Sequence, residues 1–193
     1  HRHYPAYVNG KWVPSSDGSW IAVTNPADGS LVGHVPALTR QDVEAAIQAA
    51  HDARRALREM PAIARIELLE RAAHILEAQR SMLIDIVVAE SGKPINVAKG
   101  EVKATLERLR LTAQEARSMH GEYIPGDWVE DTKNKMAIVR RVPRGVIAAI
   151  PPFNYPLSTA AAQPAPPPRA GEPDTAKPHP NTPPPRHPLP THP

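Results

Sequence analysis

One amide side chain is predicted to lie at a position where it could take part in catalysis. Asn154 lies in the Pro-Phe-Asn-Tyr-Pro segment 152–156, directly after the uncharged apolar run 146–150. This run follows a Pro-Arg-Gly turn signal, and an apolar run in this setting predicts a buried strand of a parallel sheet. Because the flanking prolines restrict the backbone, Asn154 would be held at the carboxyl end of this strand, where open α/β sheets bind ligands. Its amide could then donate hydrogen bonds to a developing oxyanion. The alternative is an Asn that only turns or caps the chain.

The residue types that are missing or scattered limit the chemistry further. With no cysteine, the chain has no disulfide, no thiolate metal ligand and no thiol nucleophile. The nine histidines show no metal-ligand spacing, so we expect no metal site. Gly92 and Lys93 lack the earlier glycine of a phosphate-binding loop, and they are better explained as a helix end. Glutamates and arginines share the segment 65–80, which is typical of a solvated helix face and not of an acid/base pair.

Short strands are predicted at the amino end. An Asn-Gly turn signal lies within residues 7–13, where aromatic and β-branched residues flank it. An Asp-Gly turn separates the strand-like segments 20–26 and 31–36. These strands lack a core of their own, so we expect residues 1–36 to form a β-hairpin arm that packs on another part of the protein.

Four helices are predicted after this arm. Thr39 is a suitable N-cap, and Asp42 follows three residues later. Pro61 restarts the chain in a first helical turn, a third helix runs from Ser81 to a Gly-then-Pro end, and a fourth covers about 94–120. The apolar residues at helical spacing are Val43, Ala46, Ile47, Ala50 and Leu57; Ile66, Leu69, Ala73 and Leu76; and Leu106, Leu109, Ala113 and Ala116.

The remaining elements complete the expected fold class. Residues 136–142 alternate enough to predict a strand that leads into the run 146–150, and a helix begins at 157–162. We therefore expect an α/β protein: a helical segment, the start of a Rossmann-like parallel sheet, and the β-hairpin arm. Residues 39–163 would be mainly helical.

Composition excludes several functional classes. The 193 residues suffice for one domain, and the net charge of +3 is spread among both signs, which indicates a solvated surface and not a nucleic-acid stripe. We expect no membrane span, because no stretch of 18 apolar residues occurs, and no secretion leader. The first residue is His1, which is typical of a fragment or processed product. We expect a cytoplasmic location.

Several segments resemble the aldehyde dehydrogenase superfamily. Residues 144–147 and 150–156 are similar to the strand and the Pro-aromatic-Asn-aromatic-Pro turn that open its cofactor domain. Glu-Ser-Gly-Lys-Pro at 90–94 resembles the family's Glu-Thr-Gly-Lys-Pro segment, and Gly-Glu-Val at 100–102 matches the helix after it. The amino-terminal arm is similar as well, so the resemblance covers residues 7–162.

This resemblance implies a site and a cofactor. Residues 37–163 would be part of an NAD(P)-binding domain, and Asn154 would help to form the oxyanion hole. The cofactor-binding residues it implies in this stretch are Ile150, Pro151, Pro152 and Phe153. The family's substrate is an aldehyde, and its members are homo-oligomers; the strand at 136–142 would belong to the oligomerisation arm.

The pattern breaks after Gln163. Residues 164–193 hold 13 of the 24 prolines, so we expect this tail to lack regular structure and a second cofactor strand not to form. Lys177 nevertheless follows Asn154 by the family's spacing of 23 positions, and the resemblance implies that it binds the adenosine ribose. The acid that often follows three residues later is replaced by Pro180, which would tolerate NADP better.

Two functions stay open. The first is a truncated NAD(P)-dependent aldehyde dehydrogenase, inactive as this chain because the family's catalytic cysteine and general-base glutamate have no counterpart here. Its substrates would be aromatic aldehydes, hydroxyaldehydes or glyceraldehyde 3-phosphate. The second is a non-catalytic interaction protein whose segment 183–190 docks as a polyproline II helix.

Overall fold

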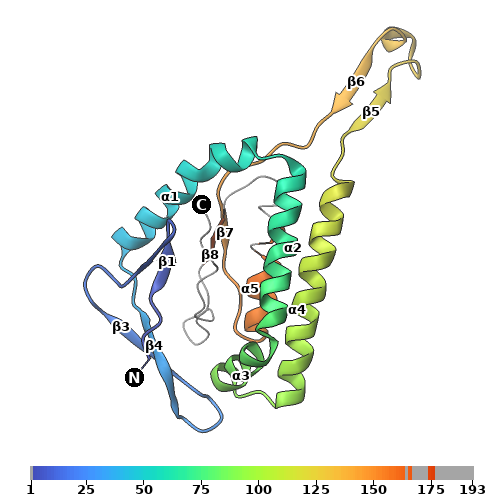
Figure 1. Cartoon of the computed structure of the whole chain (residues 1–193). Coiled ribbons are helices and arrows are strands. Elements are labelled where there is room, and N and C mark those ends of the chain that lie inside the picture. Colours follow the sequence, from blue (N-terminus) through green and yellow to red (C-terminus); the bar gives the residue numbers. More distant parts are fainter. Residues whose placement is uncertain (1, 164, 167–173, 177–193) are drawn as a thin grey trace.

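The structure is a computed structural model that describes residues 2–163, 165–166 and 174–176 (Figure 1). Lys177, Pro180 and the segment 183–190 lie outside the described residues, as does most of the expected Pro-rich tail. The predicted division into 1–36, 37–163 and 164–193 stays a prediction.

The amino-terminal arm consists of two antiparallel hairpins, as the turn signals predicted. Its strands are β1 (Ala6–Val8), β2 (Lys11–Val13), β3 (Trp20–Thr24) and β4 (Leu31–Pro36). Asn9 and Gly10 have φ angles of 49° and 77°, the left-handed pair that a two-residue hairpin turn requires. The Ser16 N–H donates to the Asp42 carboxylate at 3.1 Å, and Pro26 and Ala27 lie beside Gly92, so the arm does pack against the helical segment.

The helical segment begins with the predicted cap. The helices are α1 (Arg40–Glu59), α2 (Ala62–Ala78), α3 (Arg80–Ser91) and α4 (Ile95–Glu115), and a 3-10 turn, η1, covers Ala116–Ser118. The Thr39 N–H donates to the Asp42 carboxylate at 2.8 Å, and the Asp42 N–H donates back to the Thr39 hydroxyl at 3.3 Å. Hydrogen bonds from the N–H groups of Ser16 and Thr39 lower the pKa of Asp42 to about 2. The fourth helix is shorter than predicted, because its last turn tightens into η1 before His120.

The core forms where α2, α3 and α5 (Pro156–Ala162) pack on α4 (Figure 1). One apolar cluster joins α2 to the carboxyl half of α4, and a second joins α3 to its amino half. The predicted inward residues of α2 and α4 lie in these clusters. The apolar residues at helical spacing on α1 do not lie in these clusters. The segment is helical as predicted, but none of its residues is buried, and Val43 and Ile47 are 39% and 47% exposed.

A third hairpin, β5 (Glu122–Pro125) with β6 (Met136–Val139), extends away from the helices (Figure 1). A 3-10 turn, η2 (Glu130–Thr132), lies near its tip. The strand β6 was predicted, although it ends three residues earlier than expected. Its partner β5 was not predicted.

The parallel sheet corrects one expectation. Strand β7 (Ile147–Ala149) forms as predicted and pairs in parallel with β8 (Asp174–Ala176). The prediction that residues 164–193 lack regular structure, and that the second strand cannot form, is therefore wrong for 174–176. These three residues contain no proline, so their backbone N–H groups remain available to the ladder. The α/β fold class is confirmed.

Two glycines near the α3–α4 connection provide a matched stability test. Gly92 ends α3 in the left-handed conformation, with φ +66°, and an added Cβ would lie 3.1 Å from Ala27. Gly100 lies inside α4, and nothing lies within 4 Å of the position that a Cβ would take there. We expect Gly92→Ala to destabilise the chain by about 1–2 kcal/mol, and Gly100→Ala to stabilise it by about 0.5–1 kcal/mol. Urea unfolding measures the free energy of unfolding of both variants. Equal changes in the two variants would contradict the assignment of Gly92 as a left-handed helix cap.

Candidate functional site

The predicted site residues lie together after β7. Pro151 is buried, whereas Ile150, Pro152, Phe153 and Asn154 are exposed. Ile150 and Phe153 present apolar surface, with exposed fractions of 65% and 58%. This surface lies beyond the carboxyl end of a strand in a parallel pair, which is where α/β sheets bind ligands.

Lys93 fixes the backbone beside Asn154. Its Nζ donates a hydrogen bond to the Asn154 backbone carbonyl and lies 4.1 Å from the centroid of the Tyr155 ring. The same ammonium pairs with the Glu101 carboxylate at 2.8 Å. The amide side chain of Asn154 makes no hydrogen bond to another residue in the described part of the chain. The backbone is thus held while the amide donor stays available.

Glu101 connects α4 to the start of α5. Its side chain is completely buried, with 0% exposure. One carboxylate oxygen, Oε1, accepts hydrogen bonds from the N–H groups of Leu157 at 2.9 Å and Ser158 at 3.2 Å. Because Pro156 has no N–H, these are the first two donors of α5, and neither bonds within the helix. The other oxygen, Oε2, faces Lys93, so both oxygens of the buried carboxylate are satisfied.

Further contacts hold the turn on both sides. Arg108 Nη1 donates to the Ser158 hydroxyl at 3.1 Å. The Thr159 hydroxyl lies 2.6 Å from the Tyr155 carbonyl and 3.3 Å from the Pro152 carbonyl. Residues on either side of Asn154 are therefore tied together across the turn, which favours a rigid amide position.

The roles of Lys93 and Glu101 were not predicted from the sequence. Glu101 entered the prediction only through the family resemblance, and Lys93, together with Gly92, was also explained as a helix end. That explanation is confirmed for Gly92, which adopts the left-handed cap. Lys93 also contacts a residue 61 positions away, a distance at which no local pattern is informative. The only sequence signal was the presence of both family segments, 90–94 and 100–102.

Glu90, three positions before Lys93 in the sequence, is a second buried acid. The residue is 7% exposed, and burial raises the pKa of its carboxyl to about 9. At neutral pH Glu90 is therefore protonated, in contrast to an exposed glutamate.

Comparison with known proteins identifies the family. The profile of the aldehyde dehydrogenase family matches residues 12–186, most of the chain. The chain belongs to the aldehyde dehydrogenase family. The resemblance noted around residues 90–102 and 144–156 is thereby confirmed, whereas the interaction-protein alternative gains no support from these comparisons.

Aldehyde dehydrogenase relatives match most of the chain. It is 33% identical over 160 residues to D-glyceraldehyde dehydrogenase (NADP(+)) of Thermoplasma acidophilum, covering 83% of the chain and 32% of that protein. It is 36% identical over 166 residues to NADP-dependent glyceraldehyde-3-phosphate dehydrogenase of Streptococcus equinus, covering 86% and 34%. The crystal structure of the NADP-dependent glyceraldehyde-3-phosphate dehydrogenase of Bacillus halodurans, complexed with NADP, superposes with a TM-score of 0.90 at 37% identity, covering 94% and 38%.

The chain spans about a third of the length of these aldehyde dehydrogenases. The roles of Asn154, Ile150, Pro151, Pro152 and Phe153 stay predictions. Among the described residues, no helix has the length and apolar character to cross a bilayer. Within the same residues, no three potential metal-binding His, Cys, Asp or Glu side chains gather.

The Glu101 contacts predict a large loss on truncation. In Glu101→Ala, the Lys93 ammonium and two N–H groups lose their partner in a buried setting, which typically costs about 3–5 kcal/mol. We expect a loss of this size in urea unfolding, and faster hydrogen exchange at Leu157 and Ser158. Glu44→Ala, which removes an exposed pair with Arg40, is the control and should cost less than about 1 kcal/mol. Unchanged exchange at 157–158 would refute the capping role.

The pKa of Glu90 predicts a pH dependence. The folded carboxyl titrates near 9 and the ordinary value is 4.5, so between these values the folded chain holds a proton that the unfolded chain releases. Stability should therefore fall as the pH rises through this window. Glu90→Gln should remove this slope and be more stable than the wild type at about pH 8. Unfolding curves across the window test this, with exposed Glu107→Gln as control; identical slopes in all three proteins would contradict it.

Proposed function

We propose that this chain supplies the oxyanion donor and part of the cofactor surface of an NAD(P)-dependent aldehyde dehydrogenase, which oxidises an aldehyde to a carboxylic acid. The observation that carries this is the Asn154 turn: a backbone held by Lys93 and an amide with no hydrogen bond among the described residues. The family assignment supports the reaction class.

The role of Asn154 follows from the chemistry of the carbonyl. Nucleophilic attack on an aldehyde leaves negative charge on its oxygen, and a donor already in position stabilises that charge without reorganisation. The contacts of Lys93, Glu101 and Thr159 provide this fixed position. The attacking group must come from elsewhere, because the 193 residues contain no cysteine and an unactivated hydroxyl is a poor nucleophile. We therefore expect the chain alone to be catalytically silent.

The residues after β7 fit one wall of a cofactor site. Exposed Ile150, Pro152 and Phe153 form an apolar surface that a flat ring system can contact, whereas buried Pro151 shapes the backbone. When bound, NAD(P) accepts the hydride that leaves the substrate carbon. Several relatives bear NADP-dependent names, and Pro180 in place of an acid agrees with them. We propose NADP as the preferred form.

The names of the relatives suggest the substrate class. They act on D-glyceraldehyde, glutarate semialdehyde and glyceraldehyde 3-phosphate, according to those names. We propose a small aldehyde that carries a polar or charged group. Of the substrates expected from the sequence, hydroxyaldehydes and glyceraldehyde 3-phosphate belong to this class, and aromatic aldehydes do not.

A grafting experiment tests the proposed role of Asn154. Residues 7–162 would replace the matching segment of the Bacillus halodurans enzyme, and NADPH formation from glyceraldehyde 3-phosphate would be followed by absorbance. We expect an active chimera in which Asn154→Ala lowers kcat by roughly 100-fold or more, the scale of losing one oxyanion donor. Asn96→Ala, an exposed amide on α4, is the control and should leave kcat unchanged. An active chimera that tolerates Asn154→Ala would overturn the assignment.

We also propose that the β5–β6 hairpin mediates self-association. Its side chains Tyr123, Met136 and Ile138 are 64%, 66% and 69% exposed, and both strands lack further partners among the described residues. Ile138→Lys should therefore shift the chain toward monomer in analytical ultracentrifugation. Leu111→Lys, at a 59% exposed position on α4, is the control. A monomeric wild-type chain would contradict this proposal.

A further inference from the structure

Glu90 is a buried acid that the proposed reaction does not use. It lines a hollow of about 620 Å³ between the amino-terminal arm and α3. None of the residues 150–159, which form and hold the Asn154 turn, is among the described residues that line this hollow. The hollow is therefore a separate place in the fold, and what it could bind does not depend on the proposed reaction.

Two elements supply apolar walls to the hollow. Helix α3 contributes Met82, Ile86 and Ala89, which follow helical spacing and so lie on one face of the helix. The arm contributes Tyr4, Leu31 and Val32. A concavity of this volume with mostly apolar walls and a few polar groups is the usual form of a small-molecule site.

Gly33 on β4 makes room for the Tyr4 wall. The Tyr4 N–H donates to the His34 carbonyl at 2.8 Å, and the His34 N–H donates to the Arg2 carbonyl at 2.9 Å, so the first residues pair with β4. A Cβ at Gly33 would lie 2.5 Å from Cε2 of Tyr4, which is closer than a carbon atom can approach a ring atom. The missing side chain at Gly33 thus lets the Tyr4 ring lie against β4, and local sequence fixes this wall of the hollow.

The charges in the lining balance. Arg2 and Asp85 are exposed and carry opposite charges. Burial raises the pKa of the Glu90 carboxyl to about 9, so Glu90 is neutral at pH 7. No other Asp, Glu, Lys or Arg is among the described lining residues. The lining has no net charge that would select an ionic ligand.

The neutral carboxyl of Glu90 offers one O–H donor and a carbonyl acceptor. Its side chain makes no hydrogen bond to another residue within the part of the chain that the structure describes. Because a buried polar group without a partner is costly, a ligand that supplies both partners is favoured. A carboxamide does so: its C=O accepts from the carboxyl O–H, and its N–H donates to the carboxyl C=O. Water can pair with the carboxyl too, but only a ligand with an apolar body also covers the walls.

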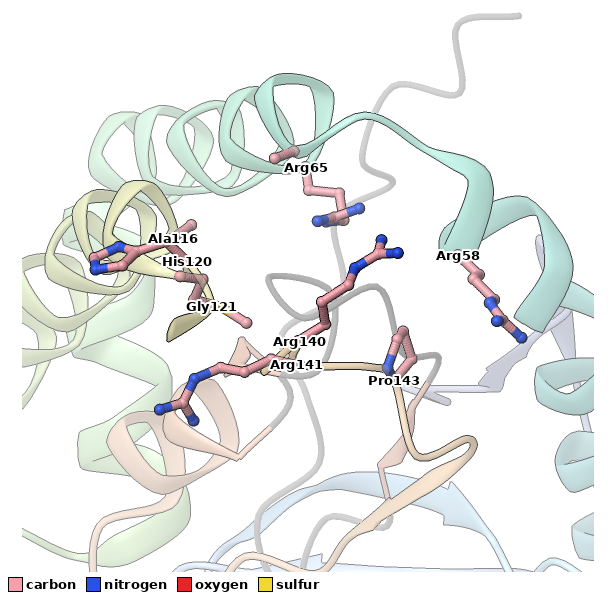
Figure 2. Close-up of a pocket in the computed structure, with 10 residues that line it drawn as sticks. Arg58, Arg65, Ala116, His120, Gly121, Arg140, Arg141 and Pro143 are labelled. Carbon is pink, nitrogen blue, oxygen red and sulfur yellow. The ribbon is translucent and has the colours of Figure 1, made fainter. Parts of the chain in front are cut away.

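We propose that the hollow between the arm and α3 binds a small apolar molecule that carries a neutral carboxamide group, which pairs with Glu90. The hollow at the base of the β5–β6 hairpin, of about 350 Å³, provides a comparison within the same chain (Figure 2). Its lining includes Arg58, Arg140 and Arg141, and no glutamate is among its described residues. A carboxamide that pairs with Glu90 should therefore leave that second hollow unoccupied.

Benzamide is the probe for a titration of the full chain at pH 7, followed by the backbone amide shifts of Leu31 and Ala89. We expect saturable binding that is about fivefold or more tighter than that of benzoate or benzylammonium, which replace the neutral amide by a charge on the same ring. Acetamide lacks the ring and should bind about tenfold or more weakly than benzamide. The proposal is overturned if benzamide gives no saturable shifts, or if benzoate or benzylammonium binds as tightly.

Variants of Glu90 test the contact itself. Glu90→Leu removes both hydrogen bonds with little change in volume and should weaken benzamide binding about fivefold or more. Glu90→Gln keeps a donor and an acceptor and should stay within about twofold of the wild type. The controls are Glu107→Leu, at an exposed position on α4, and Arg58→Gln, in the hollow of Figure 2; both should leave the affinity unchanged. Circular dichroism confirms that each variant is folded. Equal affinities of the wild type and Glu90→Leu would refute the contact, as would an equal loss in either control.

Discussion

The buried carboxylate of Glu101 is the constraint on which the candidate site depends. A charge with no solvent exposure must be matched by a counter-charge and by hydrogen bonds, or it destabilises the fold. Lys93 provides the counter-charge for Glu101, and the first two N–H groups of α5 donate hydrogen bonds to its carboxylate. Satisfying this one side chain therefore places the end of α3, the body of α4 and the start of α5 in a fixed relation.

The same helix α4 organises the apolar core. Val102 and Leu106 contact the cluster on α3, and Leu109 and Ala113 contact the cluster on α2. Because Glu101 lies three positions after Ala98, a buried member of the cluster on α3, the polar clamp and the apolar packing share one helix face. A shift of α4 would disturb both at once, which explains how a turn on the surface can be held by the interior.

Local features of the fold were predictable, and contacts across the chain were not. The Thr39–Asp42 cap and the Asn9–Gly10 turn depend on neighbouring residues, so their patterns were sufficient. The strand at 174–176 was missed because the surrounding prolines dominate the composition, although three residues between them suffice for a short ladder. The turn at Asn154 could be placed after its strand, but its clamp by Lys93 joins residues 61 positions apart and leaves no local periodicity.

The order of the clamp residues along the chain has a consequence during synthesis. Lys93 and Glu101 precede the turn that they hold by more than fifty residues. When Asn154 leaves a ribosome, α2, α3 and α4 have already been made, and their contacts are mostly among themselves. Folding of nascent chains proceeds from the amino end. The helical platform can thus assemble first and act as a template, on which the turn is captured as it emerges.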